Sequence, residues 1–155
     1  MKILDWDTYF IALAHLSALR SKDPNTKVGA VIVDDMNRIV SIGYNGMPRG
    51  CSDEDFPWER EGGFLETKYA YVVHAELNAI LNAPRSVQGC TIYVSLFPCN
   101  ECAKAIIQSG IKTIVYESDK YASADNTIAS KKMLENAGVK LKQLDFMTEV
   151  NVETK

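Results

Sequence analysis

The sequence has few of the features that indicate a secreted, membrane-spanning or nucleic-acid-binding protein. It contains no run of roughly 20 apolar residues, which a membrane-spanning helix needs. Its first residues include acids and no apolar run after a basic residue, so a secretory signal is not expected. A net charge of −3 gives no general excess of Lys and Arg for binding phosphates of nucleic acid. We therefore expect a cytoplasmic protein that binds neither membrane nor nucleic acid.

Histidine and cysteine are also scarce, with two and four copies among 155 residues. In the reduced compartment expected here, closely spaced cysteines indicate metal or redox chemistry more than disulfides. Cys51 and Cys90 stand alone, whereas Cys99 and Cys102 form a C-x-x-C pair. Such a pair occurs both in zinc sites and in thioredoxin-like redox sites, so by itself it leaves both interpretations open.

Hydrophobic periodicity and turn residues divide the chain into alternating helices and strands. Helices are expected at 5–21, 71–82, 99–109 and 124–137, and strands at 27–34, 38–44, 90–96, 112–116 and 139–144. The first two strands form a hairpin, and the three strand–helix–strand units that follow favour parallel pairing. We predict one α/β domain over residues 1–155, a three-layer α/β/α sandwich around a five-stranded mixed sheet. Residues 45–70 form a long loop of a kind that is usually functional or disordered, and residues 145–155 a mobile tail.

His74 separates the two interpretations of the cysteine pair. In a parallel strand–helix alternation, successive helices begin at the same edge of the sheet, so His74 can meet Cys99 and Cys102 there. One nitrogen and two sulfur ligands suit Zn²⁺ and leave its fourth position free, as catalytic zinc sites do. His15 and Cys51 are spare candidates for a fourth ligand, and neither is expected to close the site.

Glu76 is the acid placed to act beside this metal. Zn²⁺ with two thiolates and a neutral imidazole carries a net charge near zero, so it activates water less strongly than zinc with neutral ligands. A neighbouring carboxylate that accepts the proton of the water compensates for this weakness. Because residues two apart on a helix point in nearly opposite directions, His74 and Glu76 can share one site only at the helix end. A mid-helix position would contradict the assignment.

The segments His74-Ala75-Glu76 and Pro98-Cys99-Asn100-Glu101-Cys102 together resemble the motif of the zinc-dependent cytidine and deoxycytidylate deaminases. The stretches 20–25, 43–46, 74–79, 97–104 and 118–121 are similar to the deoxycytidylate (dCMP) deaminase branch, and the resemblance covers residues 6 to about 141. It implies that a zinc-activated hydroxide attacks C4 of the cytosine of dCMP while Glu76 shuttles the protons. The products are ammonia and dUMP, the precursor for thymidylate synthesis.

The resemblance also implies roles for other residues and further ligands. It places five residues at the bound substrate: Asn45, Ala75, Ser21, Asn25 and Tyr121, of which Ser21, Asn25 and Tyr121 are expected near the phosphate. It places an effector site at Gly43, Tyr44, Asn45 and Gly46. There dCTP is expected to activate and dTTP to inhibit, with Mg²⁺ bound beside the triphosphate. The expected assembly is a homohexamer, a trimer of dimers.

Several alternatives remain open at this point. A dual dCMP/dCTP deaminase fits the same residues, whereas a tRNA adenosine deaminase would need a basic surface for RNA. A deaminase of free cytidine is disfavoured by the long 45–70 insertion. A non-catalytic zinc module would have no use for the unliganded acid Glu76, and a redox protein predicts a Cys99–Cys102 disulfide without zinc.

Overall fold

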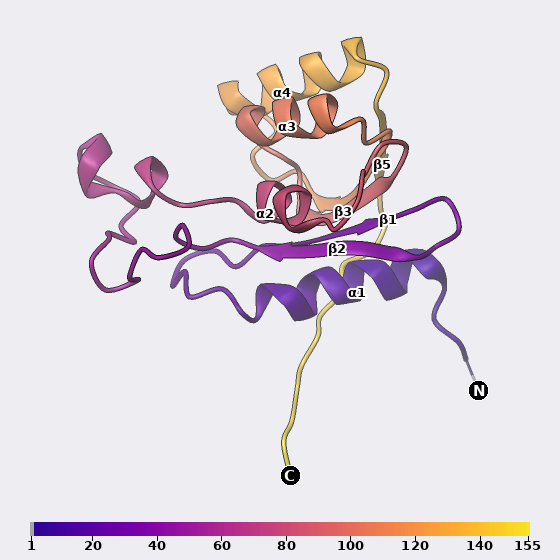
Figure 1. Cartoon of the computed structure of the whole chain (residues 1–155), viewed down its shortest axis with the longest axis horizontal. Helices are drawn as coiled ribbons and strands as arrows, with labels where there is room; N and C mark the ends of the chain where they lie inside the picture. Colours follow the sequence, from indigo (N-terminus) through magenta and orange to yellow (C-terminus); the bar gives the residue numbers. More distant parts are fainter. Residues whose placement is uncertain (1) are drawn as a thin grey trace.

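A five-stranded sheet forms the middle layer of the molecule, with helix α1 on one face and helices α2, α3 and α4 on the other (Figure 1). The computed structural model describes residues 2–155. The α-helices are α1 (Trp6–Ala18), α2 (Ala75–Asn82), α3 (Asn100–Ser109) and α4 (Asp125–Asn136). The strands are β1 (Gly29–Val33), β2 (Ile39–Tyr44), β3 (Thr91–Leu96), β4 (Thr113–Ser118) and β5 (Lys140–Gln143). The predicted α/β class with a five-stranded mixed sheet is confirmed.

Strand order in the sheet is β2-β1-β3-β4-β5. β1 pairs antiparallel with both β2 and β3, whereas β3, β4 and β5 pair in parallel. In the parallel pairing expected of the strand–helix–strand units, the two strands of one unit are neighbours. This is wrong for the first unit, β2-α2-β3, because β1 lies between β2 and β3. All five residues of β1 are buried, as expected of a strand with neighbours on both sides. Strands β2, β3, β4 and β5 all run in one direction, and only β1 runs the opposite way. Helices α2 and α3, which follow β2 and β3, therefore begin at the same edge of the sheet.

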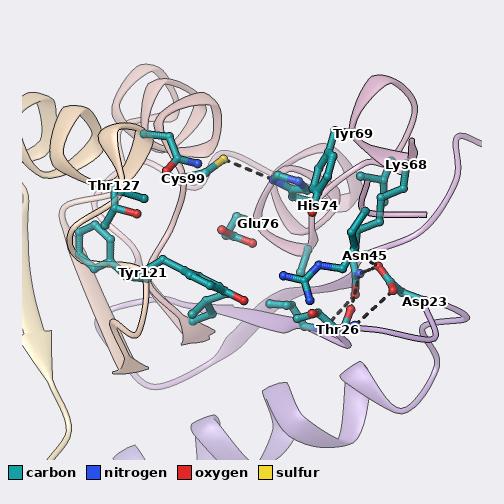
Figure 2. Close-up of a pocket in the computed structure, with 18 residues that line it drawn as sticks. Asp23, Thr26, Asn45, Lys68, Tyr69, His74, Glu76, Cys99, Tyr121 and Thr127 are labelled. Atoms are coloured by element: carbon teal, nitrogen blue, oxygen red, sulfur yellow. Dashed lines mark hydrogen bonds and ion pairs between the residues drawn. The ribbon is translucent and has the colours of Figure 1, made fainter. Parts of the chain in front are cut away.

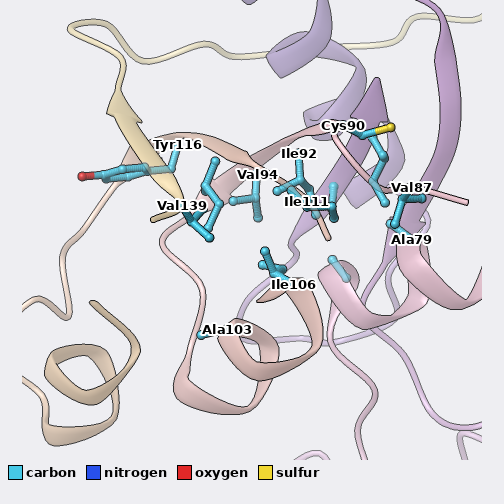
Figure 3. Packing of buried hydrophobic residues seen from close by; sticks show 14 of the residues in the cluster. Ala79, Val87, Cys90, Ile92, Val94, Ala103, Ile106, Ile111, Tyr116 and Val139 are labelled. Carbon is cyan, nitrogen blue, oxygen red and sulfur yellow. The ribbon is translucent and has the colours of Figure 1, made fainter. Parts of the chain in front are cut away.

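The core has two parts, one on each face of the sheet. Alternate residues of each strand point to opposite faces. Ile92 and Val94 of β3 face α2 and α3, and Figure 3 shows them opposite Ile106 of α3. Tyr93, between them, packs against Phe10 of α1 on the other face. The faces are therefore covered by different helices, and the site-bearing helices α2 and α3 share one core cluster.

The start of α2 differs from the prediction. The spacing predicted a helix from about residue 71, but α2 begins at Ala75. The cause is a β-bridge: Val73 N–H donates to Gly46 O at 2.8 Å, and Gly46 N–H donates to Val73 O at 3.0 Å. This bridge keeps residue 73 extended. The other predicted ends differ from the observed ones by up to about three residues, as is usual for element boundaries.

The long loop after β2 contains two short 3-10 helices, η1 (Phe64–Glu66) and η2 (Lys68–Ala70), which lie away from the sheet in Figure 1. After β5, the chain has no regular secondary structure, and Thr148 N–H donates to the Glu117 carboxylate at 2.7 Å. Mobility of residues 145–155 stays a prediction. Across residues 2–155, no helix has both the length and the apolar character needed to cross a membrane.

Candidate active site

Two helix starts carry the predicted metal ligands. His74 is the N-cap residue of α2 and Cys99 the N-cap residue of α3, and both have extended backbones. Cys102 lies in the first turn of α3. An N-cap residue stands outside the helical repeat, so its side chain need not follow the direction of a helical face. The structure thus meets the expectation that the site lies at the helix end.

The three ligand atoms lie at the separations that zinc requires. His74 Nδ1 is 3.4 Å from Cys99 Sγ and 3.4 Å from Cys102 Sγ, and the three atoms all lie within 4.8 Å of one another. Tetrahedral zinc, with bonds of about 2.0–2.1 Å to nitrogen and 2.3 Å to sulfur, places these atoms about 3.6 Å apart. The residues therefore fit Zn²⁺.

Neither spare candidate joins this group in the part of the chain that the structure describes. His15 Nε2 instead contacts the buried carboxylate of Glu117 at 2.5 Å, and Cys51 lies outside the ligand cluster. Three protein ligands leave one metal position for water or substrate, which is typical of catalytic zinc sites. Convergence of His74 on both sulfurs also favours metal binding over a redox role for the C-x-x-C pair.

The surroundings of Cys99 favour the thiolate form that a metal needs, whereas the hydrogen bond to Cys99, together with burial, raises the pKa of the Cys102 thiol. The Cys102 thiol donates a hydrogen bond to Cys99 and, with a further contribution from the His74 ring, lowers the pKa of Cys99 to about 4 despite its burial. The N-terminal end of α3 adds its positive partial charge at the same place. Cys99 is thus the ligand whose charge already favours a cation at this place.

Glu76 lies in the first turn of α2, two residues after His74, and only 5% of it is exposed. Figure 2 shows its carboxyl group beside the His74–Cys99 pair, at the centre of the cavity. Burial raises the pKa of this carboxyl above its ordinary value, because the charged form loses hydration. Among residues 2–155, no charged nitrogen of a Lys, Arg or His side chain lies within 4.0 Å of its carboxylate oxygens, so this acid has no ion-pair partner. A free, buried acid beside a metal site is suited to proton transfer.

A cavity of about 380 Å³ opens in front of the metal ligands, a volume in the range of small-ligand sites. Glu76, His74 and Cys99 form one part of its wall, and the segments before β1 and around Tyr121 form another. Polar side chains from several parts of the chain also line it: Asp23, Thr26, Asn45, Arg60, Lys68, Tyr69, Tyr121, Asn126 and Thr127. The cavity can therefore hold a polar small molecule against the metal site.

The residues expected at the substrate are only partly brought together. Asn45, Ala75 and Tyr121 line the cavity. Ser21 is buried outside its lining, where its hydroxyl oxygen accepts from the Asp23 N–H at 3.3 Å. Asn25 lines a shallower neighbouring cavity instead. The structure thus separates Ser21 and Asn25 from Tyr121.

The Asn45 side chain is held rigidly at the cavity wall. Its Oδ1 accepts from Val28 N–H at 2.9 Å, and its Nδ2 donates to Thr26 O at 3.0 Å and contacts Asp23 Oδ2 at 3.4 Å. Both amide hydrogens are engaged, while the carbonyl oxygen retains a second lone pair. Asn45 can therefore offer an acceptor to a ligand without reorientation.

The four residues expected at an effector site surround the base of α2. Gly43 lies under the helix, where an added Cβ would come within 2.4 Å of Ala75 O and Ala79 N. Tyr44 O accepts from the Asn78 side chain at 2.8 Å, and Gly46 forms the bridge to Val73. Of the four, Asn45 lines the cavity. The segment thus holds α2, which His74 caps and which carries Glu76, in place.

Sequence reasoning missed Arg60 and Lys68, both of which line the cavity. Lys68 Nζ lies 2.5 Å from Asp23 Oδ2, and the two side chains are 7% and 0% exposed. This buried ion pair ties the long loop to the segment before β1. A signal was present, because Arg60 and Lys68 are the only cations between Arg49 and Arg85, in a stretch rich in acids.

One histidine and two cysteines that fit a metal ion, beside an unpaired buried acid at the helix-start edge of a mixed α/β sheet, are typical of the class of zinc-dependent deaminases. The family model described as the cytidine and deoxycytidylate deaminase zinc-binding region matches residues 4–118, and the chain belongs to this family. As a member of it, the protein is an enzyme.

Named relatives agree with this placement. The chain is 58% identical over 138 residues to the deoxycytidylate deaminase of Homo sapiens, covering 88% of this chain and 78% of the human protein. It is 36% identical over 152 residues to the deoxycytidylate deaminase of Saccharomyces cerevisiae, covering 95% of this chain and 47% of the yeast protein. The crystal structure of dCMP deaminase from the cyanophage S-TIM5, in complex with dCMP and dUMP, superimposes with a TM-score of 0.71 at 25% identity, covering 93% of this chain and 100% of the phage chain.

Proposed function

We propose that this enzyme hydrolyses dCMP to dUMP and ammonia, with Glu76 as the proton shuttle. The observation that carries the proposal is the buried, unpaired Glu76 carboxyl beside the His74, Cys99 and Cys102 ligand group, in one cavity. The choice of dCMP is supported by relatives that bear this activity in their names and by the phage enzyme that binds dCMP and dUMP.

Zn²⁺ held by His74, Cys99 and Cys102 would supply a Lewis acid that makes water a better nucleophile at neutral pH. Glu76 accepts one proton from the attacking water and passes it to N3 of the cytosine ring. It then moves the second water proton to the amino group on C4. The C4–N bond breaks, ammonia leaves, and C4 keeps the oxygen as a carbonyl, so one water is consumed for each ammonia released.

The substitution Glu76→Gln tests this role. The variant keeps the shape of the side chain but cannot carry a proton, so kcat for dCMP should fall by at least about 100-fold. Zinc content, measured by metal analysis, should stay at the wild-type level, because Glu76 is not a ligand. Glu54→Gln, an exposed acid in the long loop, serves as the control and should retain activity. A Glu76→Gln enzyme with wild-type kcat would refute the assignment.

We also propose that dCTP activates the enzyme, that dTTP inhibits it, and that Mg²⁺ accompanies the triphosphate at Gly43–Gly46. This rests on the resemblance of that segment to dCMP deaminases. Initial rates against dCMP, with and without each nucleotide, test it, and hyperbolic kinetics that neither nucleotide changes would contradict it.

A homohexamer is expected on the same basis and is tested by the mass of the protein in solution. The cytoplasmic location stays a prediction.

A further inference from the structure

We propose that Arg60 binds the 5′-phosphate of the nucleotide and that Glu59 and Glu61 beside it discriminate against a triphosphate. This inference rests on the proposed function and deepens it, because it assigns recognition of the phosphate to the long loop. Its basis is the position of Arg60, the state of the other cations around the cavity, and the charges just outside it.

Arg60 lies where two cavities meet. It lines the inner cavity of about 380 Å³ together with His74, Glu76 and Cys99. It also lines an outer, more open cavity of about 700 Å³ with Asn25, Trp58 and Tyr69. A nucleotide whose base reaches the metal site must direct its other end toward the mouth of the inner cavity. Arg60 is therefore placed to meet the group on the far side of the sugar.

The inner cavity has two cationic side chains besides the His74 ring, and only one of them is free. Lys68 is already paired with Asp23 at 2.5 Å, and both are buried. Arg60 has no carboxylate within 4.0 Å among residues 2–155. The hydroxyls of Tyr69 and Tyr121 lie against its guanidinium group and raise its pKa further. A charged, unneutralised guanidinium has the planar donor geometry that suits phosphate oxygens.

The outer cavity is unsuited to additional phosphates. Glu59 and Glu61 line it, both are exposed, and neither has an ion-pair partner among the described residues. Arg60 is the only cationic residue in its lining. The β- and γ-phosphates of a triphosphate bound through Arg60 would extend into this region and meet two negative charges. Like charges at close range oppose binding, although solvent weakens the effect at exposed positions.

The experiment compares wild type, Arg60→Met and Arg60→Lys in two assays. The first measures equilibrium binding of the product dUMP and of deoxyuridine, which needs no turnover. The second measures kcat/KM for dCMP and for deoxycytidine without effectors. Arg49→Met removes the same charge from an exposed site in the same loop that lines neither cavity and is the matched control.

Arg60→Met should weaken dUMP binding and lower kcat/KM for dCMP by about 10- to 100-fold, as expected for loss of a charge-assisted contact. The deoxyuridine and deoxycytidine values should change less than about twofold, and Arg60→Lys should recover part of the loss. Equal losses for phosphorylated and unphosphorylated ligands would overturn the inference, because they would indicate a structural role. Unchanged dUMP binding would overturn it as well.

A second variant tests the acids. Glu59→Gln/Glu61→Gln should raise kcat/KM for dCTP relative to dCMP by about 3- to 10-fold, the effect of removing two exposed like charges. No change in this ratio would overturn the part assigned to Glu59 and Glu61.

Failure of the proposed function gives a different result: wild type would release no ammonia from dCMP, whereas Arg60-dependent preference for dUMP over deoxyuridine would still be measured.

Discussion

Replacing Lys68 by Met should destabilise the protein far more than replacing an ordinary surface lysine. Lys68 Nζ lies 2.5 Å from Asp23 Oδ2, with side chains 7% and 0% exposed. Met keeps the length and apolar stem of Lys but leaves the Asp23 carboxylate buried without its counter-ion. The lost contact also joins the long loop to the segment between α1 and β1, so its removal should free part of the cavity wall.

The size of the effect follows from what remains around Asp23. Removing one partner of a buried ion pair costs about 3–5 kcal/mol, because the other charge stays buried. The Asp23 Oδ1 atom keeps hydrogen bonds from the N–H groups of Asn25 at 2.8 Å and Thr26 at 3.2 Å. These donors continue to stabilise the carboxylate, so we expect the lower end, about 3 kcal/mol. For a chain of this length, that corresponds to a fall in Tm of about 6–12 °C.

Urea unfolding at fixed protein and zinc concentrations measures the free energy, because bound metal and association also shift stability. The control is Lys104→Met, which breaks the exposed Lys104–Glu101 pair of α3 and should cost less than about 1 kcal/mol. In the double variant Asp23→Asn/Lys68→Met, no charge is left unpaired. It should therefore be more stable than Lys68→Met alone by about 1 kcal/mol or more.

Limited proteolysis provides a local measurement. Lys68→Met should be cleaved in residues 50–70 faster than wild type, because the loop loses its buried anchor. A stability loss below about 1 kcal/mol, together with an unchanged cleavage pattern, would refute the argument that this pair behaves as a buried one.

Two further predictions concern α2 and the β1–β2 hairpin. Gly43→Ala places a Cβ within 2.4 Å of Ala75 O and Ala79 N, so α2 must shift. The free energy of unfolding should fall by about 1–3 kcal/mol in equilibrium unfolding, and zinc affinity should fall in a zinc titration. The control Gly46→Ala, with no atom within 4 Å of its added Cβ, should change neither quantity. Hydrogen bonds from the Arg38 and Met36 N–H groups and from the Arg38 and Arg85 side chains lower the pKa of Asp34 to about 2. Its folded pKa is thus below its unfolded value, so it stabilises the fold above pH of about 4 and this contribution is lost as pH falls toward 2. In urea unfolding, the stability difference between wild type and Asp34→Asn should accordingly be largest near neutral pH and shrink below pH of about 4; a difference that stays constant would contradict the assignment.

Much of the fold could be predicted because its signals are local. Gly110 shows this well: a glycine directly after the periodic residues 99–109 is the usual residue of a left-handed helix cap, and it has φ 84° at the end of α3. The insertion of β1 between β2 and β3 could not be predicted in the same way. Strand order depends on which edges pair across the sheet, and a pattern of buried residues along one strand does not specify its neighbours.

The convergence of His74, Cys99 and Cys102 could be predicted because residue type, spacing and helix position all agree on one place. For Arg60 and Lys68, no spacing rule or helix position supports what the residue type alone suggests. Each lies in a stretch without period, and its role depends on a long-range contact: Lys68 meets a residue 45 positions earlier. A single cation among acids has no spacing rule that assigns it to a cavity. Loop residues of a site therefore require the structure, whereas those on helix starts can be found from the chain alone.

Glu76 can lie beside the same site as His74, two residues earlier, because of contacts made by β2 and by Gly46, which follows it. Had α2 begun at residue 71, the two side chains would point nearly opposite ways, and the acid could not serve the metal. The Gly46–Val73 bridge keeps the chain extended up to His74, and the missing side chain of Gly43 lets α2 pack directly on the strand. The segment proposed to bind effectors therefore sets the geometry of the metal ligand and the acid. A nucleotide bound there would need to move β2 only slightly against α2 to change the alignment of His74 and Glu76, because packed backbones with no intervening side chain transmit displacement directly.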